Sequence, residues 1–428
     1  MLSNEIIKAY EDILIEELQV AMGCTEPIAI AYASSVIRDL LGCEPEKMTI
    51  GLSGNIIKNV KSVVVPSTGG MTGIESAAAA GIISGRCDMK LELLSGIDKH
   101  DIWKIKRLKE NCDIVLNELD TPCNFDVMIE AFADGHRAQV RISDYHTNIV
   151  LADLDGLDYT AEYRNEKQEI GKSLKNADRS LLNVKDIIEF ADTANLNRIA
   201  PSLVQQMEMN MAIAEEGLKN DYGATIGKIL YQDGGAPLKD RLKGYAAAGS
   251  DARMSGCELP VCIISGSGNQ GITASVPVIV YGREHGIDEE AIIRAMIVSD
   301  LITIHQKTGI GTLSAYCGAI SAGVGAGAGI CYLQGGRYHE IAHTLVNAVA
   351  ILSGTICDGA KASCAAKIAM AVEAGLIGCD MARAHKQFYG GDGIVTKGVE
   401  NTIRNVGVLA REGMSDTDKQ IIKIMLGK

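Results

Sequence analysis

The spacing of hydrophobic residues changes along the chain, and these changes predict where its parts begin and end. Over residues 4–21 apolar side chains recur three or four positions apart, which predicts an amphipathic helix. A break at Gly23-Cys24-Thr25-Glu26-Pro27 follows, and the same spacing then predicts a second helix up to Leu41. Pro27 suits the first turn of that helix, because the N–H that proline lacks would have no helical partner there.

From about residue 46 short apolar runs separated by turn residues predict an α/β region. Helices are expected over residues 73–84 and 101–110, and strands over residues 48–52, 60–65, 91–94, 112–119, 125–133, 135–142 and 147–153. Turn signals such as Thr121-Pro122 and Asp134-Gly135 separate the last four strands, so we expect these four to form an antiparallel series.

From residue 184 onward strand signals nearly vanish and helical spacing dominates. Helices are expected over residues 184–194, 201–220, 224–231, 237–254, 272–284, 289–305, 315–333, 337–352, 360–374, 381–388, 394–412 and 415–425. The predicted fold class is therefore α+β, with an all-α domain beside a smaller α/β domain that has a mixed or antiparallel sheet. The expected division is 1–42 for two N-terminal helices packed on the helical domain, 43–153 for the α/β domain, 154–183 for a polar linker and 184–428 for the helical domain.

Composition narrows the classes of function. The 428 residues carry a net charge of −13 without basic blocks, which argues against nucleic acid and anionic membranes as partners but leaves room for a small anionic substrate. Twelve cysteines are too dilute for a disulfide scaffold, and the first residues lack the pattern of a signal peptide. We therefore expect a cytoplasmic protein with reduced thiols, and Gly/Ala-rich helix surfaces favour a homodimer.

The run from residue 313 to 334 has no charged residue and is long enough to span a bilayer. It is dominated by glycine, alanine and serine, with little leucine, isoleucine or phenylalanine. A helix buried among other helices explains this composition better than a membrane span.

Three cysteines stand among very small residues: Cys317, Cys357 and Cys364. Small neighbours let the backbone approach a bulky inorganic group, and clustered thiolates hold iron–sulfur centres or zinc. The alternative is that all three are ordinary core residues, since free cysteine is often buried. Cys24 stands at the start of the second predicted helix, where the positive end of the helix dipole lowers the pKa of a thiol.

The segment Ser265-Gly266-Ser267-Gly268-Asn269-Gln270-Gly271 connects an apolar run to a predicted helix. Such a loop presents N–H groups and side-chain donors to an anion, reinforced by the helix dipole. No Lys-Ser/Thr follows the glycines, as a P-loop requires, and no acid ends a second strand, as a dinucleotide site requires. We therefore predict a small carboxylate as the ligand, with an ordinary turn between helices as the alternative. The polar stretch from Ser53 to Asn59 is a second candidate for closing over a site.

His339-Glu340-Ile341-Ala342-His343 matches the H-E-x-x-H pattern of zinc peptidases and falls on a predicted helix. The match has only three fixed residues, no third histidine follows at the required spacing, and Glu373 is merely conceivable as a third ligand. We interpret the segment as the exposed polar start of a helix, which leaves a zinc peptidase as a distant alternative.

Five motifs, taken together and in this order, resemble the L-cysteine desulfidase family, which is related to the α chain of iron–sulfur-dependent L-serine dehydratase. They are Gly23-Cys24-Thr25-Glu26-Pro27, Ser53-Gly54-Asn55-Ile56-Ile57-Lys58-Asn59, Ser265 to Gly271, Leu313-Ser314-Ala315-Tyr316-Cys317-Gly318 and Cys357-Asp358-Gly359-Ala360-Lys361. The resemblance extends over essentially the whole chain. It implies an oxygen-sensitive [4Fe–4S] enzyme that converts L-cysteine to pyruvate, ammonia and sulfide, with the cluster carried by the helical domain.

Carried over to this sequence, the resemblance implies that Cys317, Cys357 and Cys364 hold the cluster and leave one iron open. The loop between Cys357 and Cys364 is shorter than in the dehydratases, so Cys24 is the other candidate for the third ligand; otherwise we expect Cys24 to transfer the substrate proton. We expect the substrate carboxylate to bind at Ser265, Ser267, Asn269 and Gln270, with Asn55 and Lys58 closing over it from the α/β domain. The alternatives are the same chemistry on L-serine and a non-enzymatic iron–sulfur redox sensor.

Overall fold

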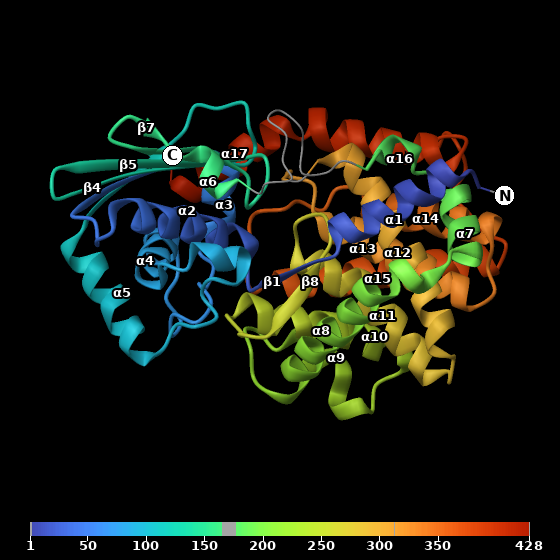
Figure 1. Ribbon diagram of the computed structural model, residues 1–428. Helices are drawn as coiled ribbons and strands as arrows, with labels where there is room; N and C mark the ends of the chain where they lie inside the picture. Colours follow the sequence, from blue (N-terminus) through green and yellow to red (C-terminus); the bar gives the residue numbers. More distant parts are fainter. Residues whose placement is uncertain (1, 165–176, 312, 428) are drawn as a thin grey trace.

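The computed structural model describes residues 2–164, 177–311 and 313–427, and its chain forms an α/β part beside a larger helical part (Figure 1). The fold is α+β, as predicted. The α/β part contains a six-stranded sheet in the order β3-β2-β4-β5-β6-β7. Its strands are β2 (Lys47–Leu52), β3 (Asp113–Glu118), β4 (Asp126–Ala133), β5 (His136–Ser143), β6 (Ile149–Leu154) and β7 (Leu157–Asp158).

The sheet is mixed, because β2 lies between two strands of opposite direction. Ile50 pairs with Leu116 of the parallel strand β3 and with Ile129 of the antiparallel strand β4. The expected antiparallel series of four is therefore wrong at its first member: β3 does not lie beside β4. The strand order follows from burial. Strand β2 contributes apolar side chains such as Met48 to the core and lies inside the sheet, whereas β3 is largely exposed and forms its edge.

The α/β part also contains three longer helices, which are α2 (Thr25–Leu41), α4 (Ile74–Ser84) and α5 (Lys99–Asn111) (Figure 1). Helix α2 packs on strands β4, β5 and β6 and on α4. The short helices of this part are α3 (Gly54–Val60) and α6 (Thr160–Tyr163). Two expected strands are absent here. Residues 60–65 end α3 and continue as a loop with a single bridge at Val64, and residues 91–94 end a 3-10 helix and turn.

The helical part follows the predicted pattern closely. Its helices are α7 (Val184–Thr193), α8 (Ala200–Lys219), α9 (Ile226–Tyr231), α10 (Leu238–Met254), α11 (Gly268–Glu284), α12 (Glu289–Ile310), α13 (Gly318–Leu333), α14 (Tyr338–Leu352), α15 (Cys364–Arg383), α16 (Val399–Val408) and α17 (Ser415–Leu426). The separate helix expected over residues 381–388 is wrong, because α15 runs without interruption to Arg383 and the following residues form turns.

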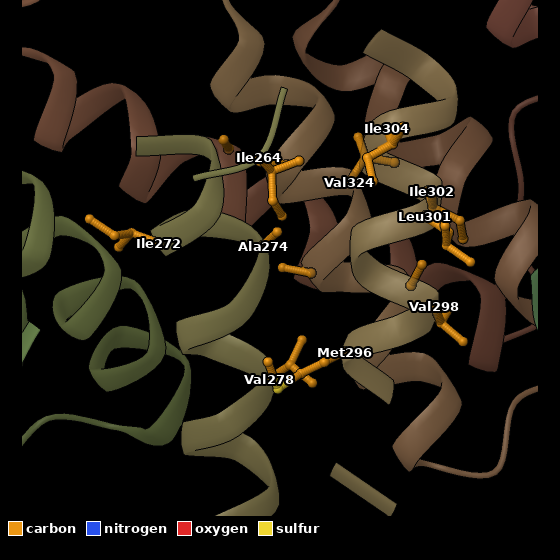
Figure 2. Packing of buried hydrophobic residues seen from close by; sticks show 14 of the residues in the cluster. Ile264, Ile272, Ala274, Val278, Met296, Val298, Leu301, Ile302, Ile304 and Val324 are labelled. Carbon is orange, nitrogen blue, oxygen red and sulfur yellow. The ribbon is translucent and has the colours of Figure 1, made fainter. Parts of the chain in front are cut away.

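The Gly/Ala-rich helix α13 lies inside the helical part, where it packs against α11, α12, α14 and α15. Apolar side chains of three neighbouring helices, among them Val278, Met296 and Val324, belong to the same buried cluster (Figure 2). Among the residues that the structure describes, no helix is long and apolar enough to cross a lipid bilayer. The expected buried helix therefore explains the uncharged run.

The N-terminal segment connects the two parts. Helix α1 (Asn4–Glu17) packs in the core of the helical part, and β1 (Gln19–Met22) then pairs in antiparallel fashion with β8 (Pro260–Ile263), with Ala21 opposite Val261. The helix expected over residues 4–21 thus ends early. Whereas both N-terminal helices were expected on the helical domain, α2 belongs to the core of the α/β part. The exact domain boundaries stay a prediction.

Candidate active site

A pocket of about 110 Å³ lies where the two parts meet. The α/β part contributes polar side chains from α2, α3 and the β5–β6 loop, and the helical part contributes the rest. The lining residues on which the following paragraphs draw are Glu26, Asn59, His146, Arg253, Ser265, Gly266, Ser267, Asn269, Gln270, Cys317, Cys357, Cys364 and Lys367. The structure thus brings the three clustered cysteines and the Ser/Gly loop to one place.

Backbone pairing holds Cys317 beside Cys357. The Cys317 N–H donates to the Thr355 carbonyl at 3.1 Å, and the Cys357 N–H donates to the Ala315 carbonyl at 2.6 Å. Between them Tyr316 forms an isolated antiparallel bridge to the second segment. Two segments about forty residues apart in the sequence are therefore joined at the site, which a motif search cannot foresee.

Three helices of the described helical part begin at the pocket. Cys317 is the N-cap residue of α13, Cys364 is the first residue of α15, and Ser267 is the N-cap residue of α11. Each helix start carries a partial positive charge and N–H groups without helical partners. The arrangement favours negatively charged groups in the pocket, whether thiolates or a substrate carboxylate.

The loop from Cys357 to Cys364 is fixed by ion pairs. Lys367 pairs with Asp358 at 2.5 Å and donates to the Ile356 carbonyl at 2.9 Å, and Lys361 also pairs with Asp358. Burial raises the pKa of Asp358, but the hydrogen bonds and charges of the two lysines outweigh it and lower the pKa to about 2. Asp358 is therefore ionised at neutral pH and orders this loop.

The three thiols bind a metal only as thiolates, and a positively charged group nearby favours the loss of their protons. Burial raises the pKa of Cys317 to about 12 and also raises the pKa of Cys364, while Lys367 acts in the opposite direction on both. A bound metal displaces such protons, because metal ligation requires thiolates. Among the described residues no set of three or more His, Cys, Asp or Glu is placed to hold a single metal ion. Three thiols around one pocket instead fit a multi-iron cluster, whose ligands bind different irons.

The Ser/Gly loop turns sharply before α11. Ser265 and Gly266 both have positive φ, 48° and 78°, as in the two central positions of a type I′ turn. The Ser267 hydroxyl then accepts from the Gln270 N–H at 3.5 Å and caps the helix. Helix α11 begins at Gly268, four residues earlier than expected, so Asn269 and Gln270 belong to its first turn.

The N-terminal segment holds this loop in place. The Ser265 N–H donates to the Glu17 carboxylate at 3.0 Å, and Glu17 in turn pairs with Arg179 at 2.9 Å. The Thr25 hydroxyl donates to the Gly266 carbonyl at 2.9 Å. Thr25 and Glu26 belong to a motif that we recognised in the sequence, and this contact explains why that motif and the loop occur together.

Arg253 adds a cation that the sequence analysis did not foresee. It is the penultimate residue of α10, carries no motif, and donates to the Asn269 side chain at 3.2 Å. The Arg253 Nε and the Gln270 Oε1 are buried and have no hydrogen-bond partner among the described residues. Buried polar atoms of this kind mark a place where a polar ligand can bind.

Two expected substrate residues do not line the pocket. The Lys58 ammonium pairs with Asp418 of α17 at 2.5 Å, and its side chain is 1% exposed. Asn55 lies on the same short helix, and its side-chain oxygen is buried without a partner among the described residues. Their neighbour Asn59 does line the pocket, as does His146, whose ring meets Phe125 edge to face.

Cys24 is the N-cap residue of α2, as the sequence predicted, but the expected decrease of its pKa is wrong. The thiol is fully buried, and burial raises its pKa to about 12, against a smaller opposing effect of Arg253. The charge of Cys364 also raises this pKa. Cys24 itself does not line the pocket.

The histidine motif gains no support as a zinc site. The rings of His339 and His343 lie side by side on α14, tilted by 38° with centroids 4.2 Å apart, and Glu340 accepts from the Arg337 N–H as part of a helix cap. Glu373, the conceivable third ligand, pairs with Lys243 at 2.6 Å. The exposed polar helix start is thus the better interpretation.

Comparison with known proteins identifies a family for this chain. A family model described as "Serine dehydratase alpha chain" matches residues 89–423. The chain belongs to this family. The serine dehydratase alpha chain match includes the Ser/Gly loop and all three clustered cysteines, and it begins after Cys24.

Similar proteins extend over nearly the whole chain. A UPF0597 protein of Desulfitobacterium hafniense is 52% identical over 98% of this chain and 97% of its own length. UPF0597 proteins of Lachnoclostridium phytofermentans and Treponema denticola are 46% and 45% identical, each over 97% of this chain and over 98% and 97% of their own lengths. These relatives therefore share the N-terminal segment as well as the family region.

Proposed function

We propose that the protein is an L-cysteine desulfidase, which eliminates sulfide from L-cysteine to give pyruvate and ammonia. Membership of the serine dehydratase alpha chain family indicates a lyase-type enzyme related to iron–sulfur dehydratases. The observation that carries the proposal is that Cys317, Cys357 and Cys364 line the same pocket as the Ser/Gly loop. A redox sensor would need the thiols but not a loop suited to a carboxylate.

Cys317, Cys357 and Cys364 are the residues that would hold a [4Fe–4S] cluster, with one iron left without a protein ligand. Such a cluster supplies a Lewis acid for the leaving sulfur, because soft thiolate ligands suit iron. Cys364 is favoured over Cys24 as the third ligand, since Cys364 lines the pocket and Cys24 does not. The positive ends of α13 and α15, together with Lys367, offset the negative charge of the thiolates.

The substrate carboxylate is assigned to the first turn of α11. Ser265 and Ser267 offer hydroxyls there, and Asn269 and Gln270 offer side-chain amides beside the Arg253 guanidinium. Holding the carboxylate against a cation and a helix start makes the neighbouring α-hydrogen easier to remove, because charge that develops during its loss is stabilised. Asn59 replaces Asn55 and Lys58 as the contact expected from the α/β part.

Cys24 remains the proposed proton-transfer residue. Its buried thiol keeps its proton at neutral pH, so the proposal requires the ammonium group of the bound substrate to lower this pKa, as a nearby positive charge does. Removal of the α-proton and departure of the β-sulfur as sulfide leave aminoacrylate. Aminoacrylate then hydrolyses to pyruvate and ammonia without further catalysis.

The test is product analysis of protein whose cluster has been reconstituted without oxygen. With L-cysteine we expect sulfide and pyruvate in equal amounts. Absence of sulfide from protein with an intact cluster spectrum would contradict the proposal. A spectrum that changes when L-cysteine is added supports a substrate at the cluster, whereas an unchanged spectrum favours a sensor.

L-serine dehydratase activity is the second candidate, because the matching family model carries that name. The carboxylate site would serve both substrates, since they differ only in the leaving group. Comparison of kcat/KM for L-cysteine and L-serine in the same preparation decides between them. A higher kcat/KM for L-serine assigns the dehydratase function.

A further inference from the structure

Helices α13 and α15 run side by side in the same direction, in close contact at small residues. A β-carbon added to Gly327 would lie 2.5 Å from the Gly375 carbonyl oxygen, and one added to Gly323 would meet the backbone of Ala371. Both pairs join residues 48 apart, so a step of four residues along α13 matches a step of four along α15. Only parallel helices can repeat a contact in this way.

The next step of four brings Cys331 of α13 to Cys379 of α15, again 48 residues apart. Each residue is only 1% exposed, and neither forms a disulfide. The two thiols are neighbours, and each is the main influence on the pKa of the other. This contact lowers the pKa of Cys331 and raises the pKa of Cys379.

A cavity separate from the candidate active site is lined by one member of this pair, Cys379. It has a volume of about 550 Å³, and its lining includes Cys379, Gln334 and Arg383 but none of the residues around Cys317. The Gln334 side-chain oxygen accepts from the Cys379 thiol at 3.5 Å and from Arg383 at 3.0 Å. A small neutral molecule can therefore approach the Cys379 sulfur, which lies beside Cys331, without entering the substrate pocket.

We propose that Cys331 and Cys379 form a redox-active dithiol that hydrogen peroxide oxidises to a disulfide. One of the two sulfurs, as a thiolate, attacks one peroxide oxygen, the O–O bond breaks, and the departing hydroxide takes the proton that this sulfur lost to become water. The other sulfur then attacks the sulfur of the resulting sulfenic acid; the S–O bond breaks, and the second hydroxide leaves as water with the proton of the second thiol. The dithiol loses two electrons and the peroxide is reduced to two waters.

The position of the pair gives the oxidation a structural consequence. Cys317 and Cys364 stand at the N-terminal ends of α13 and α15, and the dithiol lies about four turns farther along the same two helices. A disulfide would fasten these helices together on the side away from the pocket. This inference does not depend on the proposed function, because it concerns thiols that do not line the site.

The experiment maps the disulfide directly. Full-length protein is treated without oxygen with one equivalent of hydrogen peroxide, its remaining thiols are alkylated, and it is digested with trypsin without reductant. We expect loss of free thiol from the peptide 368–383, which contains Cys379, and its appearance joined to the peptide 308–337. Fragmentation of the joined product locates the bond, and no turnover assay is involved.

A matched pair of variants separates the two cysteines of peptide 308–337. Cys331→Ser should abolish the joined product, whereas Cys317→Ser should retain it. If Cys331→Ser does not fold, as judged by circular dichroism, Cys379→Ser provides the reciprocal test. A joined product that survives Cys331→Ser, or wild-type thiols at 331 and 379 that both remain open to alkylation after peroxide, would overturn the proposal.

Discussion

The ion pair between Lys58 of α3 and Asp418 of α17 holds the C-terminal helix against the α/β part. Because the two side chains differ in burial, we expect their replacement to destabilise this contact by different amounts. The Lys58 side chain is 1% exposed and the Asp418 side chain 13% exposed, with 2.5 Å between Nζ and Oδ1. Replacing Asp418 by Asn leaves a buried ammonium without its counter-charge. Replacing Lys58 by Met leaves a carboxylate that water can still reach. The first substitution should therefore cost more than the second.

The magnitude follows from the burial of the two partners. Removing one partner of a buried ion pair costs about 3–5 kcal/mol, and we take about 3 kcal/mol for Asp418→Asn because its carboxylate is partly hydrated. For Lys58→Met we expect about 1 kcal/mol, closer to the range of exposed pairs. The double variant Lys58→Met with Asp418→Leu should recover most of the loss, since apolar side chains can replace a buried pair.

Hydrogen exchange of the amides of α17 provides the assay, because it measures local opening of this helix rather than global unfolding. A loss of about 3 kcal/mol corresponds to exchange roughly 10²-fold faster, and about 1 kcal/mol to roughly fivefold. Amides of α13, which lies in the buried core of the helical part and contains neither partner of the pair, serve as the internal control. Equal acceleration by both single variants, or none by either, would refute the reasoning from burial.

Two further predictions concern cofactor binding and pH. Cys317→Ala or Cys357→Ala should abolish the visible absorption of the reconstituted cluster. Cys24→Ala should keep most of that absorption and lose turnover. Loss of the absorption in Cys24→Ala would make Cys24 a cluster ligand instead. Burial raises the pKa of Asp300 to about 8, so between about pH 4 and 8 the folded protein binds a proton that the unfolded chain does not. Its unfolding free energy should therefore fall, relative to Asp300→Asn, by at most about 1.4 kcal/mol per pH unit as pH rises through this window. Urea unfolding of both proteins at pH 5 and 8 measures the difference, and a constant difference would contradict a buried neutral aspartic acid.

Local patterns in the sequence were sufficient to predict most of the helices. The uncharged Gly/Ala run was predicted as a buried helix because its composition suits close packing, and α13 has that position. The strand β1 was missed because Leu18 and Ala21 also fit helical spacing. Its partner β8 is about 240 residues away, and a pairing of such range overrides local propensity.

In the candidate site, too, residues with a distinctive local sequence could be predicted, and residues brought there by distant contacts could not. Small or polar neighbours in the sequence made it possible to identify Cys317, Cys357 and Ser267 as candidate site residues. Arg253 stands in an ordinary helical stretch, and only the packing of α10 against α11 brings it to Asn269. Lys58 was expected to close over the substrate because it belongs to a polar stretch, but its partner comes from a helix about 360 residues later in the sequence.

The pairing of β1 with β8 has a consequence for synthesis of the chain. The Thr25 hydroxyl and the Gly266 carbonyl that it contacts are separated by 241 residues. At ribosomal rates of about 5–20 residues per second, roughly 12 to 50 s pass between the emergence of the first strand and that of its partner. During that interval β1 is an unpaired strand edge, which is the kind of surface that chaperones cover. The loop between β8 and α11 can take its final shape only after this wait, so the candidate active site should be among the last features of the nascent chain to form.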